Sequence, residues 1–235
     1  MADGAHCTIT YRGHGRYYNL MFNIHKEYHR HSLDTLNLLY EYDDFMLSVS
    51  TMVDLGCGSG LDLEWWATRT TREDNPQPLN IKCTGVDVLD SLPIAAKYSN
   101  IVYQKNNFED TIYLPKNGKY DVLWCHDAFQ YAVNPLRTLS NWWQIASPNA
   151  MLIIIVPDTL SIRRKVTAIE QPLGCYYHYS LVNLMHMLAV SGWDCASGFF
   201  KRAANDPWIH TVVYKSEHAP MDPKTTTLYD LVERK

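Results

Sequence analysis

Short apolar runs alternate with amphipathic stretches along most of this chain. The runs are rich in β-branched side chains, which is typical of parallel strands buried on both faces. We predict strands at 52–55, 81–88, 101–104, 120–125 and 151–156 and a terminal strand pair at 193–200 and 208–215. We predict helices between the strands at 61–70, 91–98, 135–146 and 178–191. This alternation predicts an α/β fold with about seven mostly parallel strands and helices on both faces.

The first fifty residues show helical rather than strand spacing. Leu33, Leu36 and Leu39 recur at the period of a helix face, and Ser32 stands where an N-cap is expected. We expect a single domain over 1–235, divided into a helical lid-like extension at 1–50, a Rossmann-like core at 51–215 and a C-terminal tail at 216–235. Within the core, residues 68–80 contain two prolines and predict a surface insertion.

Composition and charge limit the function classes. The 235 residues are 46% hydrophobic and 20% charged, as in ordinary globular domains. The formal net charge is -4, so no general positive field attracts a polyanion, and a nucleic-acid partner is not expected. Six scattered cysteines indicate reduced thiols, and the apolar run 151–156 is too short to span a membrane. We expect a cytoplasmic protein; its oligomeric state is left open.

A glycine-rich loop follows the first predicted strand directly. In Asp54-Leu55-Gly56-Cys57-Gly58-Ser59-Gly60 three glycines alternate with other residues, and a helical segment begins immediately afterwards. Glycine permits a sharp turn with positive φ and lets a ligand approach the backbone closely. The loop is therefore a candidate nucleotide or nucleoside site, although a simple tight turn between strand and helix has the same pattern.

An acidic residue ends the next predicted strand. Asp87 stands where a carboxylate can accept hydrogen bonds from both hydroxyls of a ribose. Its distance from Gly60 exceeds the usual spacing of about 20 residues, and the insertion at 68–80 accounts for the surplus. The alternative is that Asp87 only caps the helix that follows. Loop and acid together predict a Rossmann-like nucleoside site.

These motifs resemble the class I S-adenosylmethionine-dependent methyltransferases over residues ~50–215, and more narrowly their small-molecule, ubiquinone-biosynthesis-like branch. That family has D-x-G-x-G-x-G after the first strand, as in Asp54 to Gly60, whereas dinucleotide dehydrogenases have G-x-G-x-x-G, which Leu61 breaks. Pro148-Asn149-Ala150 departs from the family's usual Pro-Gly-Gly. The resemblance implies S-adenosylmethionine as cofactor, S-adenosylhomocysteine as product and a small-molecule methyl acceptor.

The resemblance also assigns residues to the cofactor. It places the loop against the methionine moiety, Asp87 on the ribose, Val88 and Leu89 beside the adenine, and Asn107 and Phe108 at the adenine edge. Arg12 or Arg16 is a candidate partner of the cofactor carboxylate. The predicted cofactor-binding residues are Asp54, Gly56, Cys57, Gly58, Gly60, Asp87, Val88, Asn107, Phe108, Cys125 and Arg16.

Candidates for chemistry and acceptor binding follow strand four and precede the last large helix. His126 is a candidate general base because imidazole titrates near neutral pH and this one follows the strand's carboxyl end; a purely structural histidine is the alternative. His178 is a second candidate catalytic residue. Tyr131, Tyr176 and Tyr177 are candidate substrate-binding residues, since aromatic faces attract cations and exclude water.

The sequence leaves alternative functions open. His25 and His29 lie one helical turn apart, but Lys26 stands where a zincin has Glu, so we expect no metal. Cys125-His126-Asp127-Ala128 matches neither an Asp-Pro-Pro-Tyr-like tetrad nor a Pro-Cys nucleophile of DNA methyltransferases. An RNA-directed enzyme and a non-catalytic homologue that binds the cofactor are the alternatives to a small-molecule methyltransferase.

Overall fold

Seven strands form a single sheet in the computed structural model, which describes residues 43–71, 74–110, 112, 114–115, 118–159, 176–201 and 208–222. The strands are β1 (Thr51–Leu55), β2 (Lys82–Asp87), β3 (Ile101–Lys105), β4 (Tyr120–His126), β5 (Ala146–Pro157), β6 (Trp193–Lys201) and β7 (Trp208–Lys215). Their order is β3-β2-β1-β4-β5-β7-β6, and β7 runs antiparallel to both of its neighbours. The predicted fold class is confirmed.

The helices are shorter than their sequence pattern suggested. They are α2 (Asp43–Ser48), α3 (Leu61–Ala67), α4 (Pro135–Ile145) and α6 (Leu181–Val190), with 3₁₀ turns η1 (Pro93–Ala96) and η2 (Phe129–Tyr131). The helix predicted at 91–98 is only η1, whose first residue is a proline. The helix predicted at 178–191 begins at 181 because Ser180 is its N-cap, closed reciprocally by Asn183 in a capping box.

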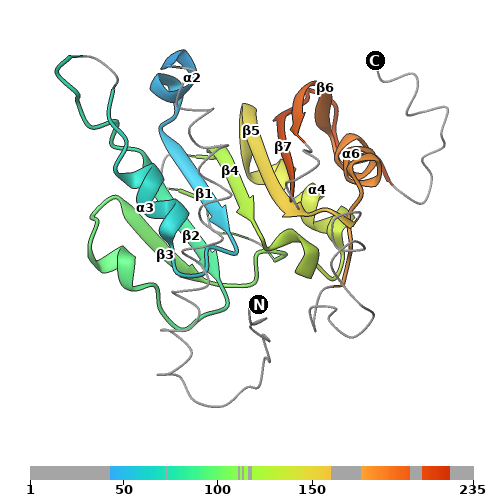
Figure 1. Cartoon of the computed structure of the whole chain (residues 1–235), viewed down its shortest axis with the longest axis horizontal. Helices are drawn as coiled ribbons and strands as arrows, with labels where there is room; N and C mark the ends of the chain where they lie inside the picture. The colour runs from blue at the N-terminus through green and yellow to red at the C-terminus, as the bar shows by residue number, and fades with distance from the viewer. Residues whose placement is uncertain are drawn as a thin grey trace, which may run out of the picture.

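Helices pack on both faces of the sheet, as Figure 1 shows. On one face α3 contributes Leu63, Trp65 and Trp66 to a core with Met52 of β1 and Trp124 of β4. The other face is covered by α4 and α6; its core holds Leu139, Trp142, Leu184, Leu188 and the opposite-facing residues of the same strands. Adjacent residues of β4 therefore point into different cores, because side chains alternate along a strand.

The predicted surface insertion closes on itself between α3 and β2. Thr70 pairs with Pro78 in an isolated antiparallel bridge, and the amide of Thr71 donates to the carbonyl of Gln77 at 2.8 Å. Residues 74–78 are exposed, as predicted for this loop. The insertion therefore lengthens the chain between the glycine loop and Asp87 without separating them.

No helix in the described ranges is long and apolar enough to cross a membrane. The predicted helical extension falls outside those ranges except for α2 at its end, and most of the predicted tail does so as well.

Candidate active site

The glycine loop connects β1 to α3 in a backbone conformation that requires glycine. Gly56, Gly58 and Gly60 have φ of 83°, 51° and 81°, in the left-handed region that side chains rarely adopt. A β-carbon on Gly56 would lie 2.4 Å from the β-carbon of Ala128, which follows β4. The loop thus packs directly against the chain beyond β4, and two segments of the carboxyl edge meet there.

The amides of this loop already have acceptors within the protein. Gly56 and Cys57 donate to the carbonyl of Val86 at 2.8 and 3.1 Å, and Gly60 donates to the carbonyl of Cys57 at 2.8 Å. Gly58 donates to Asp87 Oδ2 at 2.9 Å. A loop that binds a pyrophosphate presents its amides to the anion. These four amides are already used, so the arrangement suits a ligand without phosphate.

Asp87 ends β2 and points back toward the loop. Its Oδ2 accepts the amide of Gly58, and its Oδ1 accepts the amide of Leu89 at 3.2 Å. An ionised carboxylate has about four acceptor sites, so two are left by the bonds among the described residues, as many as the hydroxyls of a ribose require. Beside it, 61% of Val88 is exposed, which leaves that side chain free to cover a flat ring. The positions of both residues fit the predicted roles, which stay predictions.

Three carboxylates lie close together beneath the loop. Asp54 is only 2% exposed, and its pKa is raised well above the ordinary value by burial, by the charge of Asp62 and by that of Asp87. Asp62 belongs to the first turn of α3 and is also buried. A buried cluster of like charges favours a cationic ligand, which relieves the repulsion.

The remaining predicted cofactor residues differ in their hydrogen bonds and in their burial. Asn107 Oδ1 accepts the amide of Glu109 at 3.1 Å, and the carbonyl of Phe108 accepts Trp142 Nε1 at 2.9 Å. Cys125 is fully buried in the core beneath α4, and burial raises the pKa of its thiol. Only the backbone of Cys125 therefore reaches the carboxyl edge. Arg12 and Arg16 lie outside the described residues.

His126 is the last residue of β4, and its ring is held from one side by α3. Its Nδ1 lies 2.9 Å from Asp62 Oδ2, and the same oxygen accepts Trp124 Nε1 at 2.9 Å. Burial lowers the pKa of His126, but the charge of Asp62, the hydrogen bond to it and the charge of Asp127 raise it above its ordinary value overall. The sequence analysis missed Asp62; its place in the first turn after Gly60 was the available signal.

Asp127 directly follows His126 and adds another carboxyl group to this edge. It has φ of 52°, and its Oδ1 accepts Gln130 Nε2 at 2.6 Å. Burial raises the pKa of Asp127 to about 6, although the charge of His126 and the bond from Gln130 oppose that shift. Asp127 was not among the predicted site residues, because a single carboxylate after a strand carries no distinctive pattern.

The predicted substrate-binding tyrosines gather beside η2. The amides of Tyr176 and Tyr177 both donate to the carbonyl of Gln130, at 3.1 and 3.2 Å. Their side chains are 66% and 39% exposed, and that of Tyr131 is 38% exposed. His178 is exposed beside them and precedes α6 rather than opening it. The fold therefore brings these residues to one edge, although 45 positions separate Tyr131 from Tyr176 in the chain.

Residues 25–197 match a protein family described as "Methyltransferase domain". This match covers more than half of the chain. The chain belongs to this methyltransferase family. The predicted enzyme class and S-adenosylmethionine as the cofactor are confirmed at the level of the family. A search of curated proteins by sequence finds no match.

Solved structures of similar fold support the same architecture for the methyltransferase. A plantazolicin methyltransferase in complex with S-adenosylhomocysteine has a TM-score of 0.63 at 17% identity, covering 86% of this chain and 90% of that one. The 1,6-didemethyltoxoflavin-N1-methyltransferase of Burkholderia thailandensis has a TM-score of 0.55 at 11% identity, covering 89% and 94%. An S-adenosylmethionine-dependent methyltransferase from Listeria monocytogenes has a TM-score of 0.52 at 17% identity, covering 73% of this chain and 93% of that one.

The carboxyl-edge residues of the methyltransferase fit this cofactor. S-adenosylmethionine carries a sulfonium and an ammonium group but no phosphate. The cluster of Asp54, Asp62 and Asp87 suits the cationic groups, and the amides of Gly56, Cys57, Gly58 and Gly60 are already bonded within the protein. When bound, the cofactor supplies an activated methyl group.

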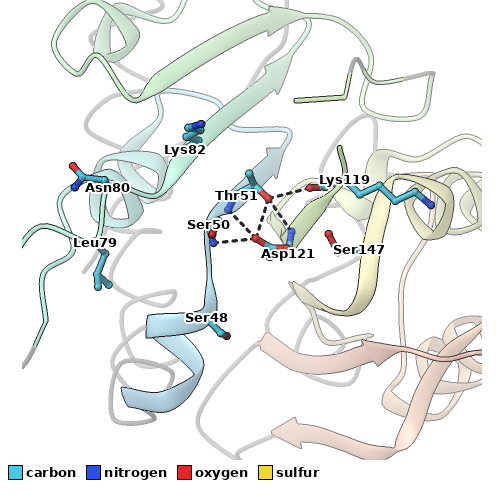
Figure 2. Close-up of a pocket in the computed structure, with 9 residues that line it drawn as sticks. All are labelled: Ser48, Ser50, Thr51, Leu79, Asn80, Lys82, Lys119, Asp121 and Ser147. Carbon is cyan, nitrogen blue, oxygen red and sulfur yellow. Dashed lines mark hydrogen bonds between the residues drawn. The ribbon is translucent and has the colours of Figure 1, made fainter. Parts of the chain in front are cut away.

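A groove of about 540 Å³ lies at the opposite, amino edge of the methyltransferase's sheet. In Figure 2 its centre is Asp121, whose Oδ2 accepts the amides of Ser50 and Thr51 at 2.9 and 3.0 Å. The carboxylate therefore joins β1 to β4, and the side chain of Lys119 points away from it. The groove and the glycine loop lie at opposite ends of the strands, so we interpret the groove as a structural feature of the sheet and not as part of the active site.

Proposed function

We propose that this methyltransferase transfers the methyl group of S-adenosylmethionine to a small-molecule acceptor by in-line displacement. The observation that carries the proposal is the concentration of carboxylates at the carboxyl edge. Asp54, Asp62, Asp87 and Asp127 all lie there, two of them buried. Such an edge suits a cationic cofactor and disfavours the phosphates of a nucleic acid, in keeping with the net charge of -4.

The chain's own residues would bind and orient the reactants. Asp87 would accept hydrogen bonds from the ribose, and Asp54 would lie near the methionine moiety. Val88 would cover the adenine, whose edge would meet Asn107 and Phe108. Orientation of this kind supplies most of the rate, since alignment at contact distance contributes about 7–11 kcal/mol.

The acceptor would lie on the side of η2. The exposed faces of Tyr131, Tyr176 and Tyr177 offer an apolar wall that excludes water from a flat substrate. His126, held by Asp62, would remove a proton where the acceptor carries one. This placement agrees with the small-molecule branch of the family, which we include in the proposal.

Two measurements test this function. Calorimetry of the full-length protein should show binding of both S-adenosylmethionine and S-adenosylhomocysteine. Incubation with cofactor labelled in the methyl group and a metabolite extract should place the label in small molecules. Label recovered only in added RNA would overturn the choice of acceptor, and binding without any transfer would indicate a non-catalytic homologue.

A further inference from the structure

Asp54 is a buried carboxyl group in the middle of the sheet. It lies on β1 between Gly85 of β2 and Trp124 of β4, its partners in register, and is only 2% exposed. Its side chain points to the α3 face, because it alternates with Val53 and Leu55, which belong to the opposite core. None of the described residues donates a hydrogen bond to its oxygens. The carboxyl group therefore lacks the partners that normally stabilise a buried charge.

Two further carboxylates act on this position from neighbouring elements. Asp62 of α3 accepts Nε1 of Trp124, the residue paired with Asp54, at 2.9 Å. Asp87 ends β2, the other neighbour of β1, and its Oδ2 accepts the amide of Gly58 at 2.9 Å. Both accept hydrogen bonds that favour their charged form. Of the three carboxyl groups, Asp54 is therefore the least stabilised as an anion.

Titratable groups from the loop, β2 and β4 also face Asp54. Burial raises the pKa of three thiols, and the charge of Asp54 raises it further: those of Cys57 in the loop, Cys83 in β2 and Cys125 in β4. His126 joins the cluster through Asp62, whose Oδ2 lies 2.9 Å from its Nδ1. Neutral thiols do not offset a charge, so ionisation of Asp54 depends on the other carboxylates and on a cation that binds beside them.

We propose that Asp54 is neutral in the free enzyme and releases its proton when S-adenosylmethionine binds, so that it selects the positively charged cofactor over the product. This inference rests on the proposed function and adds a residue that determines specificity for the cofactor. The proton passes to solvent, and the carboxylate that remains faces the added positive charge. No bond of the cofactor is broken in this step.

The difference in charge between cofactor and product supplies the discrimination. S-adenosylmethionine carries a sulfonium and an ammonium group, whereas S-adenosylhomocysteine has a neutral sulfur and keeps the ammonium. In an interior of low dielectric constant, a positive charge acts on a carboxyl group without touching it. An opposite charge within about 4–6 Å lowers the pKa of a carboxyl group by about one to three pH units. By linkage, the ionised site binds that charge about 10–10³-fold more tightly than the neutral site.

The sign of the pH dependence follows from the direction in which the proton moves. Binding that releases a proton becomes tighter as pH rises, by up to about tenfold per pH unit while Asp54 is neutral in the free enzyme and ionised in the complex. Binding of the product releases less of the proton, because the sulfonium is absent. The preference for cofactor over product should therefore increase with pH.

Calorimetry of the full-length protein between about pH 5 and pH 8 measures this linkage. Titrations in two buffers of different ionisation enthalpy count the protons released on binding. Wild type should release up to about one proton with S-adenosylmethionine and fewer with S-adenosylhomocysteine. The ratio of the two dissociation constants should shift in favour of the cofactor by about 10-fold or more across this range.

Asp54→Asn is the decisive variant, because an amide has nearly the shape of the neutral acid and cannot ionise. His126, Asp127 and the amino group of the ligands still titrate in this variant, so its difference from wild type isolates Asp54. The ratio of the two dissociation constants should become nearly independent of pH. Asp90→Asn, which changes an exposed carboxylate paired with Lys105, is the matched control and should behave as wild type. Equal proton release in wild type and Asp54→Asn would refute this inference, whereas absence of cofactor binding to wild type would overturn the proposed function.

Unfolding in urea without cofactor tests the neutral state of Asp54 separately. A carboxyl group whose pKa is raised in the folded protein destabilises it as pH increases above the ordinary value of about 3.9. Asp54→Asn should therefore unfold at a higher urea concentration than wild type at about pH 8, and at nearly the same concentration at about pH 4. A variant that loses stability relative to wild type between these two pH values would show that Asp54 is charged in the free enzyme, and would overturn the inference.

Discussion

The close approach of Gly56 to Ala128 gives a sharp test of why the loop needs glycine. In Gly56→Ala the new β-carbon would lie 2.4 Å from that of Ala128, far inside normal contact distance, and φ is 83°. Overpacking costs about 1–3 kcal/mol, and a left-handed non-glycine residue costs about 1–2 kcal/mol. We therefore expect a loss of about 2–5 kcal/mol in the free energy of unfolding, measured by urea denaturation.

A second substitution separates the two costs. Ala128→Gly removes the atom that the new β-carbon meets; the next atoms, Phe108 Cδ1 and Ala128 Cα, lie at 3.7 and 3.8 Å. By itself it should cost about 1–2 kcal/mol from a lost buried methyl and a freer unfolded chain. The double variant should recover the steric part, so the coupling energy should be about 1–3 kcal/mol. Affinity for S-adenosylmethionine should fall in Gly56→Ala and recover partly in the double variant.

Gly118→Ala provides the control for backbone conformation. Gly118 has φ of 120°, and a β-carbon there would meet nothing within 4 Å, so that variant shows a backbone cost without a clash. If the effects of Gly56→Ala and Ala128→Gly add within about 0.5 kcal/mol, the contact is not what excludes a side chain from position 56, and the steric reasoning is wrong.

Three further outcomes are expected. Asp87→Ala should weaken S-adenosylmethionine binding by about 1–3 kcal/mol in calorimetry. The control is Asp90→Asn, which changes an exposed carboxylate paired with Lys105 and should leave the affinity unchanged. Equal affinities of Asp87→Ala and wild type would refute the assignment of Asp87 to the ribose. Gly58→Val should abolish cofactor binding with a normal circular dichroism spectrum, because φ there is 51°; normal binding would mean that the loop is only a turn. Because the pKa of Asp127 is raised to about 6, its contribution to stability is present below about pH 3.9 and is lost as pH rises through 6. The free energy of unfolding of Asp127→Asn, measured in urea, should therefore exceed that of wild type by about 1–3 kcal/mol at pH 8 but not at pH 4. An equal difference at both pH values would contradict the raised pKa of Asp127.

Local patterns in the sequence were enough to predict the sheet and the loop. Apolar β-branched runs must be buried on both faces, and helices between them must cover those faces, so the α/β class follows from periodicity alone. The alternating glycines between Asp54 and Leu61 similarly indicate a positive-φ turn, which the structure confirms. Helix ends were less well predicted, because Ser180 and Pro93 determine them through single contacts rather than through a period.

Tertiary structure alone decided the surroundings of the candidate base. His126 and Asp62 are 64 positions apart, and nothing in either segment indicates the other. They meet because β4 lies beside β1, and α3, which follows β1, crosses the face to which alternate residues of β4 point. The same packing buries Asp54 beside Asp62 and directs the thiol of Cys125 into the opposite core. Periodicity determines which face a residue occupies, but the order of the strands determines which residues it meets there.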